Sequence, residues 1–103
     1  MAELVVRPKV QALLDSLENE AYSKALRFLT FLDRGRYELR EPHTKKLTRN
    51  IYELRIPGKQ EVRLLYGFKN GDIIVVSGFI KKTQKTPPVE IEKAEREYAT
   101  LDI

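Results

Sequence analysis

Arg63 and a group of lysines stand where strands could hold positive charge in fixed positions. Arg63 interrupts the mainly apolar run of residues 61–68. The run of residues 75–80 is followed by three lysines, Lys81, Lys82 and Lys85. A cation delivered by a buried strand is held rigidly, and partial shielding from water strengthens its attraction for an anion. We therefore expect a phosphate-binding site, with the backbone of a nucleic acid as the ligand.

The distribution of charge along the chain points to the same kind of ligand. The net charge is +4, and residues 34–85 hold thirteen Lys or Arg against five Asp or Glu. Because both ends of the chain are mildly acidic, we expect one positively charged face that binds a polyanion. The alternative is an ordinary solvated surface with an excess of lysine.

Composition argues against several other classes of function. The chain has no cysteine, one histidine (His43) and scattered aspartates, so we expect no disulfide framework and no metal site. The glycine patterns of dinucleotide sites and phosphate-binding loops are absent, and we expect no cofactor. No apolar run is long enough to span a membrane, and the N-terminus does not resemble a signal peptide. A cytoplasmic protein without a membrane partner is expected.

The length of 103 residues predicts a single domain, residues 1–103. Its first part is expected to contain a short strand at residues 3–7 and two helices. The first helix begins at Pro8, and the second ends near Gly35, a suitable residue just after a helix. Residues 37–49 show no clear periodicity and are predicted to form a loop.

Three strands and a helix are expected in the second part. The strands are predicted at residues 51–56, 61–68 and 73–82, with an Asn-Gly turn before the last of them. A C-terminal helix begins at about Pro88, with Thr86 as its N-cap. The order β-α-α-β-β-β-α indicates an α+β fold, in which a helical hairpin and a C-terminal helix cover mostly one face of antiparallel sheet hairpins.

The alternation of side chains along a strand sorts the charged residues by face. In residues 62–68 the even positions are apolar, which leaves Arg63 on the other face. In residues 52–56 the same reasoning leaves Glu53 and Arg55 together. If the apolar faces point toward the helices, these three charged residues meet on the opposite face. The alternative is a solvated face that carries a weak Glu–Arg pair.

The lysines are harder to place. Lys81 and Lys82 project to opposite faces of a regular strand, so at most one would join Arg63. A bulge near Gly78, or a strand end that turns both lysines outward, is the alternative. One lysine could also serve only to protect the end of a very apolar strand from aggregation.

Several segments resemble the phage-derived, HigB-like branch of the RelE superfamily, the toxins of type II toxin–antitoxin modules. The resemblance runs from about residue 45 to 96. Its most specific part is Gly-Phe-Ile-Lys-Lys-Thr-Gln-Lys-Thr-Pro at residues 78–87. Residues 45–47, 51–55 and 62–66 are also similar. The resemblance implies a RelE-like fold.

It also implies an activity. Members of that superfamily are ribosome-dependent mRNA endonucleases, and a cognate helix-turn-helix antitoxin inhibits them. The reaction is metal-free: the ribose 2′-OH attacks the adjacent phosphate and leaves a 2′,3′-cyclic phosphate and a 5′-OH. Such a reaction needs a proton acceptor, cations for the phosphate, and a proton or cation for the leaving oxygen. The implied partners are mRNA on the ribosome and the antitoxin.

Individual roles follow from the resemblance. Arg63 matches the arginine that stabilises the phosphate, and Lys81 or Lys82 matches the basic residue that assists the leaving group. Arg55 matches a supporting position in substrate contact. The other residues predicted to contact RNA are Lys45, Lys46, Arg49, Tyr66 and Lys85.

The proton acceptor is where this chain departs from the family. RelE has lysines at the positions of Ile51 and Glu53, and a C-terminal tyrosine near Pro87 or Pro88. Glu53 ranks first as a replacement because it shares the face of Arg63. The other candidates are Tyr52, Tyr66 and His43. The alternative function is a non-catalytic relative that binds RNA, the ribosome or an antitoxin through the same basic face.

Overall fold

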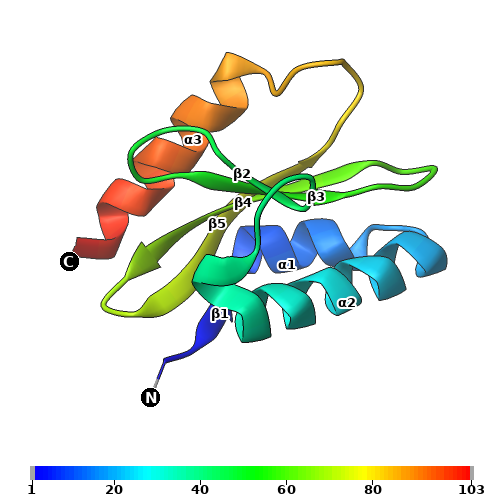
Figure 1. Ribbon diagram of the computed structural model, residues 1–103. Helices are drawn as coiled ribbons and strands as arrows, with labels where there is room; N and C mark the ends of the chain where they lie inside the picture. Colours follow the sequence, from blue (N-terminus) through cyan, green and yellow to red (C-terminus); the bar gives the residue numbers. More distant parts are fainter. Residues whose placement is uncertain (1, 103) are drawn as a thin grey trace.

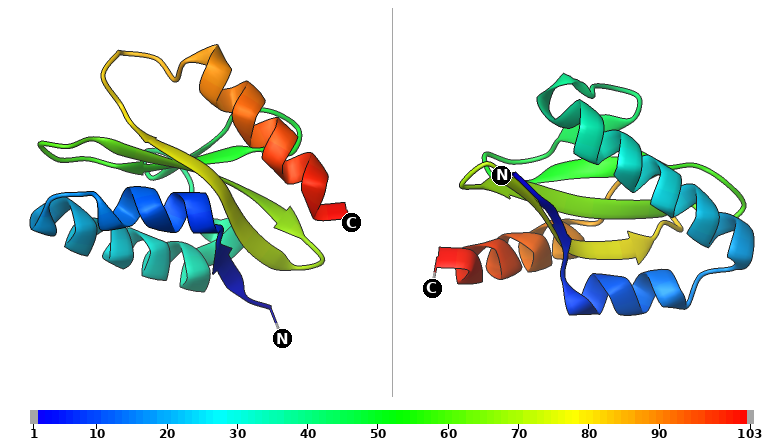
Figure 2. Two further views of the ribbon diagram at one scale, coloured as in Figure 1. Left: turned by 180° about the vertical axis from the view of Figure 1, so that it is seen from behind. Right: turned by 90° about the horizontal axis from the view of Figure 1, so that it is seen from below.

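A five-stranded sheet in the order β1-β5-β4-β3-β2 runs through the middle of the molecule, with helices on both faces (Figure 1 and Figure 2). The computed structural model describes residues 2–102. The strands are β1 (Leu4–Val6), β2 (Thr44–Lys46), β3 (Tyr52–Ile56), β4 (Val62–Lys69) and β5 (Asp72–Ile80). The helices are α1 (Pro8–Asp15), α2 (Asn19–Gly35) and α3 (Pro88–Ala99). Short 3₁₀ turns at Arg36–Glu38 and Thr100–Asp102 follow α2 and α3.

The structure has one strand more than the sequence predicted. Residues 44–46 form the edge strand β2, which pairs antiparallel with β3 within the segment predicted as a loop. Only Thr44 of this strand is buried, while Lys45 and Lys46 are exposed. A three-residue edge strand with one buried side chain produces no detectable periodicity, so the prediction of an uninterrupted loop was wrong.

Helices cover the two faces of the sheet unequally. The helices α1 and α2 pack against one face, where their leucines meet Leu54, Leu64 and Val75. The helix α3 packs on the opposite face through Ala94, against Leu65 and other residues of β4 and β5. The expectation that helices lie mostly on one face holds for the hairpin α1–α2 but is wrong for α3. None of the helices within residues 2–102 is long and apolar enough to cross a membrane.

The central hairpin of β4 and β5 follows the predicted turn. Asn70 and Gly71 both have positive φ angles, 54° and 85°, as a tight hairpin turn of this sequence requires. Lys69 then pairs with Asp72 across the two strands. The apolar residues 73–76 of β5 are buried, alternately on both faces, because both faces of the sheet are covered.

A β-bulge in β5 changes which side chains reach which face. Tyr66 pairs with Val75 and Leu65 pairs with Ser77, so Val76 is an extra residue without a partner on β4. The bulge shifts the alternation by one residue: Val75 packs under α1 and α2, whereas Phe79 packs with α3. Beyond the bulge, odd-numbered residues of β5 share a face with Arg63, which pairs directly with Phe79.

The predicted end of α2 near Gly35 and start of α3 at Pro88 are confirmed, but the residues predicted to cap these two ends differ from the structure. The helix α2 includes Gly35 in helical conformation (φ −80°), and the positive φ falls on Arg36 instead. A Cβ at Gly35 would approach Leu39 to 2.8 Å, so glycine allows the chain after α2 to fold back closely. Thr86 does not cap α3: the N-cap residue is Pro87, and the Thr86 hydroxyl donates its hydrogen bond to Glu53.

Candidate functional site

A cavity of about 470 Å³, called here the basic cavity, lies between the sheet and the segment that leads into α3. Its lining contains five basic side chains and one acidic side chain, that of Glu53. The basic residues are Lys45, Arg55, Arg63, Lys81 and Lys85. Gln84, Thr86, Leu47 and Ile91 complete the lining. The cavity therefore has a net positive charge and is suited to an anion.

Sheet register brings these residues together. Arg55 on β3 lies directly opposite Arg63 on β4, and Lys45 on β2 lies directly opposite Glu53 on β3. Paired residues of neighbouring strands project to the same face. The predicted meeting of Arg63, Arg55 and Glu53 on one face is therefore confirmed as geometry. The face is not open to solvent as a whole, because α3 covers its other end.

Arg63 is unusually buried for a positively charged side chain. It is 9% exposed, and its ion pair within residues 2–102 joins Nη2 to Glu61 Oε2 at 3.5 Å. Its Nε is buried without a hydrogen-bond partner. A buried donor without an acceptor costs free energy, on the order of 1–3 kcal/mol and more for a charged group. The guanidinium, which lines the basic cavity, therefore has hydrogen-bonding capacity that residues 2–102 do not use.

Glu53 is buried at 2% exposure and both of its carboxylate oxygens are engaged. Oε1 accepts a hydrogen bond from Arg55 Nε at 3.2 Å, and Oε2 accepts one from the Thr86 hydroxyl. The carboxylate thus ties β3 to the segment before α3. It also fixes the direction of the Arg55 side chain, which keeps two like-charged arginines side by side.

Only one of the two strand-end lysines lines the basic cavity. Lys81 does so because the bulge at Val76 places it on the face of Arg63, and its backbone N–H donates to the Glu61 carbonyl at 2.7 Å. Lys82 lines an adjoining cavity of about 410 Å³ with Glu61, Thr83 and Gln84. Lys81 and Gln84 belong to both cavities, so the two are neighbours.

The remaining residues predicted to contact RNA divide into two groups. Lys45 and Lys85 line the basic cavity, whereas Lys46, Arg49 and Tyr66 do not. Lys46 lies over the ring of Tyr52, 5.7 Å from its centroid, on the helical-hairpin side of the sheet. Tyr66 is buried on that same side, and burial raises its pKa to about 12. Because its side chain is buried away from the basic cavity, Tyr66 does not offer RNA a contact surface or a proton acceptor in this structure.

Two further candidates for the proton acceptor, Tyr52 and His43, also lie outside the basic cavity. Tyr52 stacks on Tyr66, with ring centroids 5.5 Å apart. The His43 ring contacts Phe28 edge-on, with centroids 6.0 Å apart. Neither residue lines the basic cavity. Within residues 2–102, no group of three or more His, Cys, Asp or Glu side chains is arranged to hold a metal ion.

Sequence reasoning missed two residues at the site. The carboxylate of Glu61 is 45% exposed beside Arg63, and the alternation of β4 already places residues 61 and 63 on one face. That signal was available in the sequence. Thr86 contacts Glu53 across a separation of 33 residues, which no local pattern indicates.

Comparisons with known proteins place this geometry in context. Residues 12–99 match the family described as phage-derived protein Gp49-like (DUF891). The fold is similar to a chain in the crystal structure of the heterotetrameric YoeB–YefM toxin–antitoxin complex from Staphylococcus aureus. The TM-score is 0.57 and the identity 18%, over 81% of this chain and 98% of the other. No curated protein matches the sequence.

Proposed function

This chain belongs to the phage-derived Gp49-like family, and we propose that it is the toxin of a type II toxin–antitoxin module. Its proposed activity is the ribosome-dependent, metal-free cleavage of mRNA, and its proposed partners are translated mRNA and a helix-turn-helix antitoxin, all in the cytoplasm. The similarity in fold to a chain of a toxin–antitoxin complex supports the toxin assignment. Membership in the HigB-like branch of the RelE superfamily stays a prediction.

The observation that carries the proposal is the unused hydrogen-bonding capacity of the Arg63 guanidinium. This arginine is buried directly opposite Arg55, and its Nε has no hydrogen-bond partner within the described residues 2–102. Two like charges held side by side are unfavourable without an anion between them. A phosphate that enters the basic cavity would accept hydrogen bonds from both guanidinium groups and relieve their repulsion.

The reaction assigns one task to each group. The 2′-OH oxygen of a bound ribose attacks the adjacent phosphorus, and Glu53 accepts the proton from this hydroxyl. Arg63 and Arg55 stabilise the negative charge that builds on the non-bridging oxygens. Lys81 donates a proton to the 5′-oxygen as its bond to phosphorus breaks. The products are a 2′,3′-cyclic phosphate and a 5′-OH.

A non-catalytic relative is the second candidate, and one observation favours it. Glu53 is almost fully buried, and both of its oxygens already accept hydrogen bonds. To accept a proton from substrate, the carboxylate must exchange the hydrogen bond of Thr86. A protein in which this exchange does not occur would bind RNA or the ribosome through the basic cavity without cutting.

Cell-free translation of a defined mRNA distinguishes the two functions. The wild-type chain is expected to cleave the mRNA only while it is translated, and to leave 2′,3′-cyclic phosphate ends. Arg63→Ala should reduce the cleavage rate on the order of 10²–10³-fold. Arg96→Ala, at an exposed residue of α3 outside the basic cavity, is the matched control and should retain the rate. Binding to ribosomes without cleavage would establish the non-catalytic function instead.

A further inference from the structure

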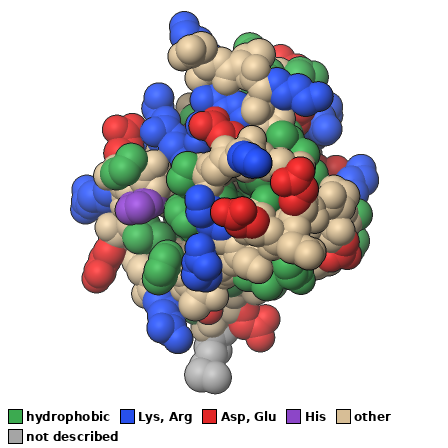
Figure 3. All heavy atoms as spheres, turned by 90° about the vertical axis from the view of Figure 1, so that its right-hand side faces the viewer, with side chains coloured by type: hydrophobic (Ala, Val, Ile, Leu, Met, Phe, Trp, Pro, Cys, Tyr) green, Lys and Arg blue, Asp and Glu red, His purple; other side chains and the backbone are tan. Residues whose placement is uncertain are grey.

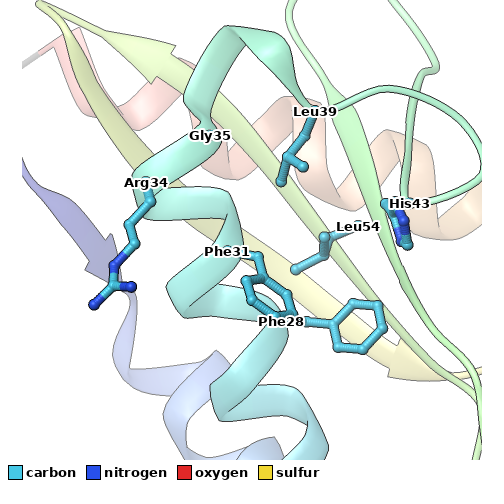
Figure 4. A pocket seen from close by; sticks show the side chains of 7 residues that line it. All are labelled: Phe28, Phe31, Arg34, Gly35, Leu39, His43 and Leu54. Atoms are coloured by element: carbon cyan, nitrogen blue, oxygen red, sulfur yellow. The ribbon is translucent and has the colours of Figure 1, made fainter.

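A further cavity lies on the other side of the sheet, between α2 and the segment that leads into β2. This apolar cavity has a volume of about 400 Å³. Its walls come mainly from Phe28, Phe31, Leu39 and Leu54, with Arg34 and His43 on its two flanks (Figure 4). The residues of the basic cavity contribute nothing to it. The apolar cavity and the basic cavity therefore share no lining residue and differ in chemistry.

Phe31 exposes a large apolar surface at this cavity. Its side chain is 56% exposed, although its ring contacts Phe28 edge-on at a centroid distance of 6.3 Å. Figure 3 shows hydrophobic side chains at the surface next to the histidine of the chain. Apolar area left in water costs about 25 cal/mol per Å², so covering an exposed aromatic ring beside a cavity is favourable. Such surfaces mark sites where partners bind.

The charges around Phe31 indicate what kind of partner fits. Arg27, Phe31 and Arg34 are exposed and lie four and three residues apart on α2, which places them on one side of the helix. Neither arginine has an acidic partner within the described residues 2–102. Asp33, the acidic residue in the last turn, is already paired with Arg36 at 2.9 Å. The complementary surface is acidic and carries a large apolar side chain.

A protein segment matches this surface better than a nucleic acid does. The cavity walls are aromatic and aliphatic, and they offer few groups that could hydrogen-bond to base edges. Phe28, Leu39 and Leu54 belong to the core under α1 and α2, whereas Arg63 faces the α3 side of the sheet. A nucleotide bound beside Phe31 could not place its own phosphate at Arg63.

We propose that the apolar cavity is the docking site of the antitoxin, which inserts one large apolar side chain of an acidic segment beside Phe31. This inference rests on the proposed function, because the toxin–antitoxin module supplies the occupant. Substrate and antitoxin then contact opposite faces of the sheet, and mutations at one face can be separated from mutations at the other.

The experiment measures antitoxin affinity and mRNA cleavage on the same variants. The chain is co-expressed with the product of the adjacent helix-turn-helix gene that the proposed function requires, and the purified toxin is titrated with that antitoxin. Phe31→Ser should weaken binding at least tenfold and leave mRNA cleavage within about threefold of wild type. Val89→Ser is the matched control, since Val89 is also 56% exposed but lies on α3, across the sheet.

A charge reversal and a peptide array test the chemistry of the partner. Arg27→Glu combined with Arg34→Glu should weaken antitoxin binding at least tenfold, whereas Arg96→Glu on α3 should not. Among 15-residue peptides that tile the antitoxin, the peptide that binds wild type but not Phe31→Ser should be acidic and contain Leu, Phe or Trp.

The possible failures are distinguishable. Equal antitoxin affinity for wild type and Phe31→Ser overturns the docking site but not the toxin function. Loss of ribosome or RNA binding in Phe31→Ser, with antitoxin binding intact, overturns the proposal in favour of a nucleic-acid surface. If the wild-type chain binds the antitoxin through Phe31 but cleaves no mRNA, the nuclease function fails and the docking site stands. Absence of any complex with wild type overturns both the partner and the site.

Discussion

Arg55 and Arg63 lie directly opposite each other on neighbouring strands, and each forms an ion pair with the glutamate two residues earlier in the chain. The distances are 3.2 Å from Arg55 Nε to Glu53 Oε1 and 3.5 Å from Arg63 Nη2 to Glu61 Oε2. The two glutamates differ, because Glu53 is buried and Glu61 is half exposed. The two arginines therefore differ in what their removal leaves behind.

Replacing Arg63 with Met is expected to stabilise the fold by about 0.5–1 kcal/mol. The change removes a like-charge pair and a buried unpaired N–H, and it leaves only the accessible Glu61 without a partner. The free energy of unfolding in urea gives the comparison with wild type. Arg55→Met is the matched variant and should destabilise by about 1–3 kcal/mol, because the buried Glu53 loses its ion pair. Equal destabilisation by both changes would contradict the account of Arg63 as a buried cation whose Nε has no hydrogen-bond partner within residues 2–102.

Glu53 and Glu61 are the two carboxylates that could accept the proton of the 2′-OH. Glu53→Gln should lower the single-turnover rate of mRNA cleavage by on the order of 10² or more, since general-base catalysis contributes about 10²–10⁴-fold. Glu61→Gln should leave the rate within a few-fold of wild type. The pH dependence of the rate provides a second readout, because loss of the base removes the rise of the rate with pH. The opposite pattern of rates would move the role to Glu61.

Binding of RNA should weaken steeply with salt. Each phosphate contact with a single strand contributes about −0.7 to the slope of log K against log salt concentration. Arg63→Ala is expected to make the slope shallower by about one contact, as is Lys81→Ala. Lys46→Ala should change the slope less, because Lys46 lies outside the basic cavity, over the ring of Tyr52. Filter binding to ribosomes between 50 and 300 mM salt, roughly the range over which such contacts are lost, is the measurement. A flat dependence for wild type would exclude phosphate contacts.

The raised pKa of Tyr66 predicts that the fold loses stability at alkaline pH. Burial raises its pKa from the ordinary value of 10.0 to about 12, against a smaller opposing contribution from the neighbouring Thr44 side chain. The folded state therefore prefers the protonated hydroxyl. Its contribution to stability is complete below pH 10 and decreases as the pH rises from about 10 to 12. In urea titrations, Tyr66→Phe should lose less stability than wild type across this range. Parallel curves for the two proteins would rule out Tyr66 as the source.

Much of the fold and part of the site follow from local sequence. The Asn70–Gly71 turn, the helix that begins at Pro8 and the apolar strand at residues 73–76 all have short-range signals, and the structure contains each of them. The edge strand β2 was missed because a three-residue strand with one buried side chain has no period to detect. The docking of α3 on the second face depends on contacts such as the hydrogen bond from the Tyr98 hydroxyl to the Phe68 carbonyl, 30 residues apart.

At the site, the sequence by itself determined that Arg63, Arg55 and Glu53 share a face, because alternation along each strand is a local property of the chain. Only the tertiary structure decided which lysine joins them. The bulge at Val76 arises from the pairing of β5 with β4, and it turns Lys81 rather than Lys82 toward Arg63. The hydrogen bond from Thr86 to Glu53 was likewise decided by the fold, since it joins segments 33 residues apart. A bulge and a long-range contact depend on how strands and loops pack against one another. The periodicity of the sequence is local and does not predict that packing.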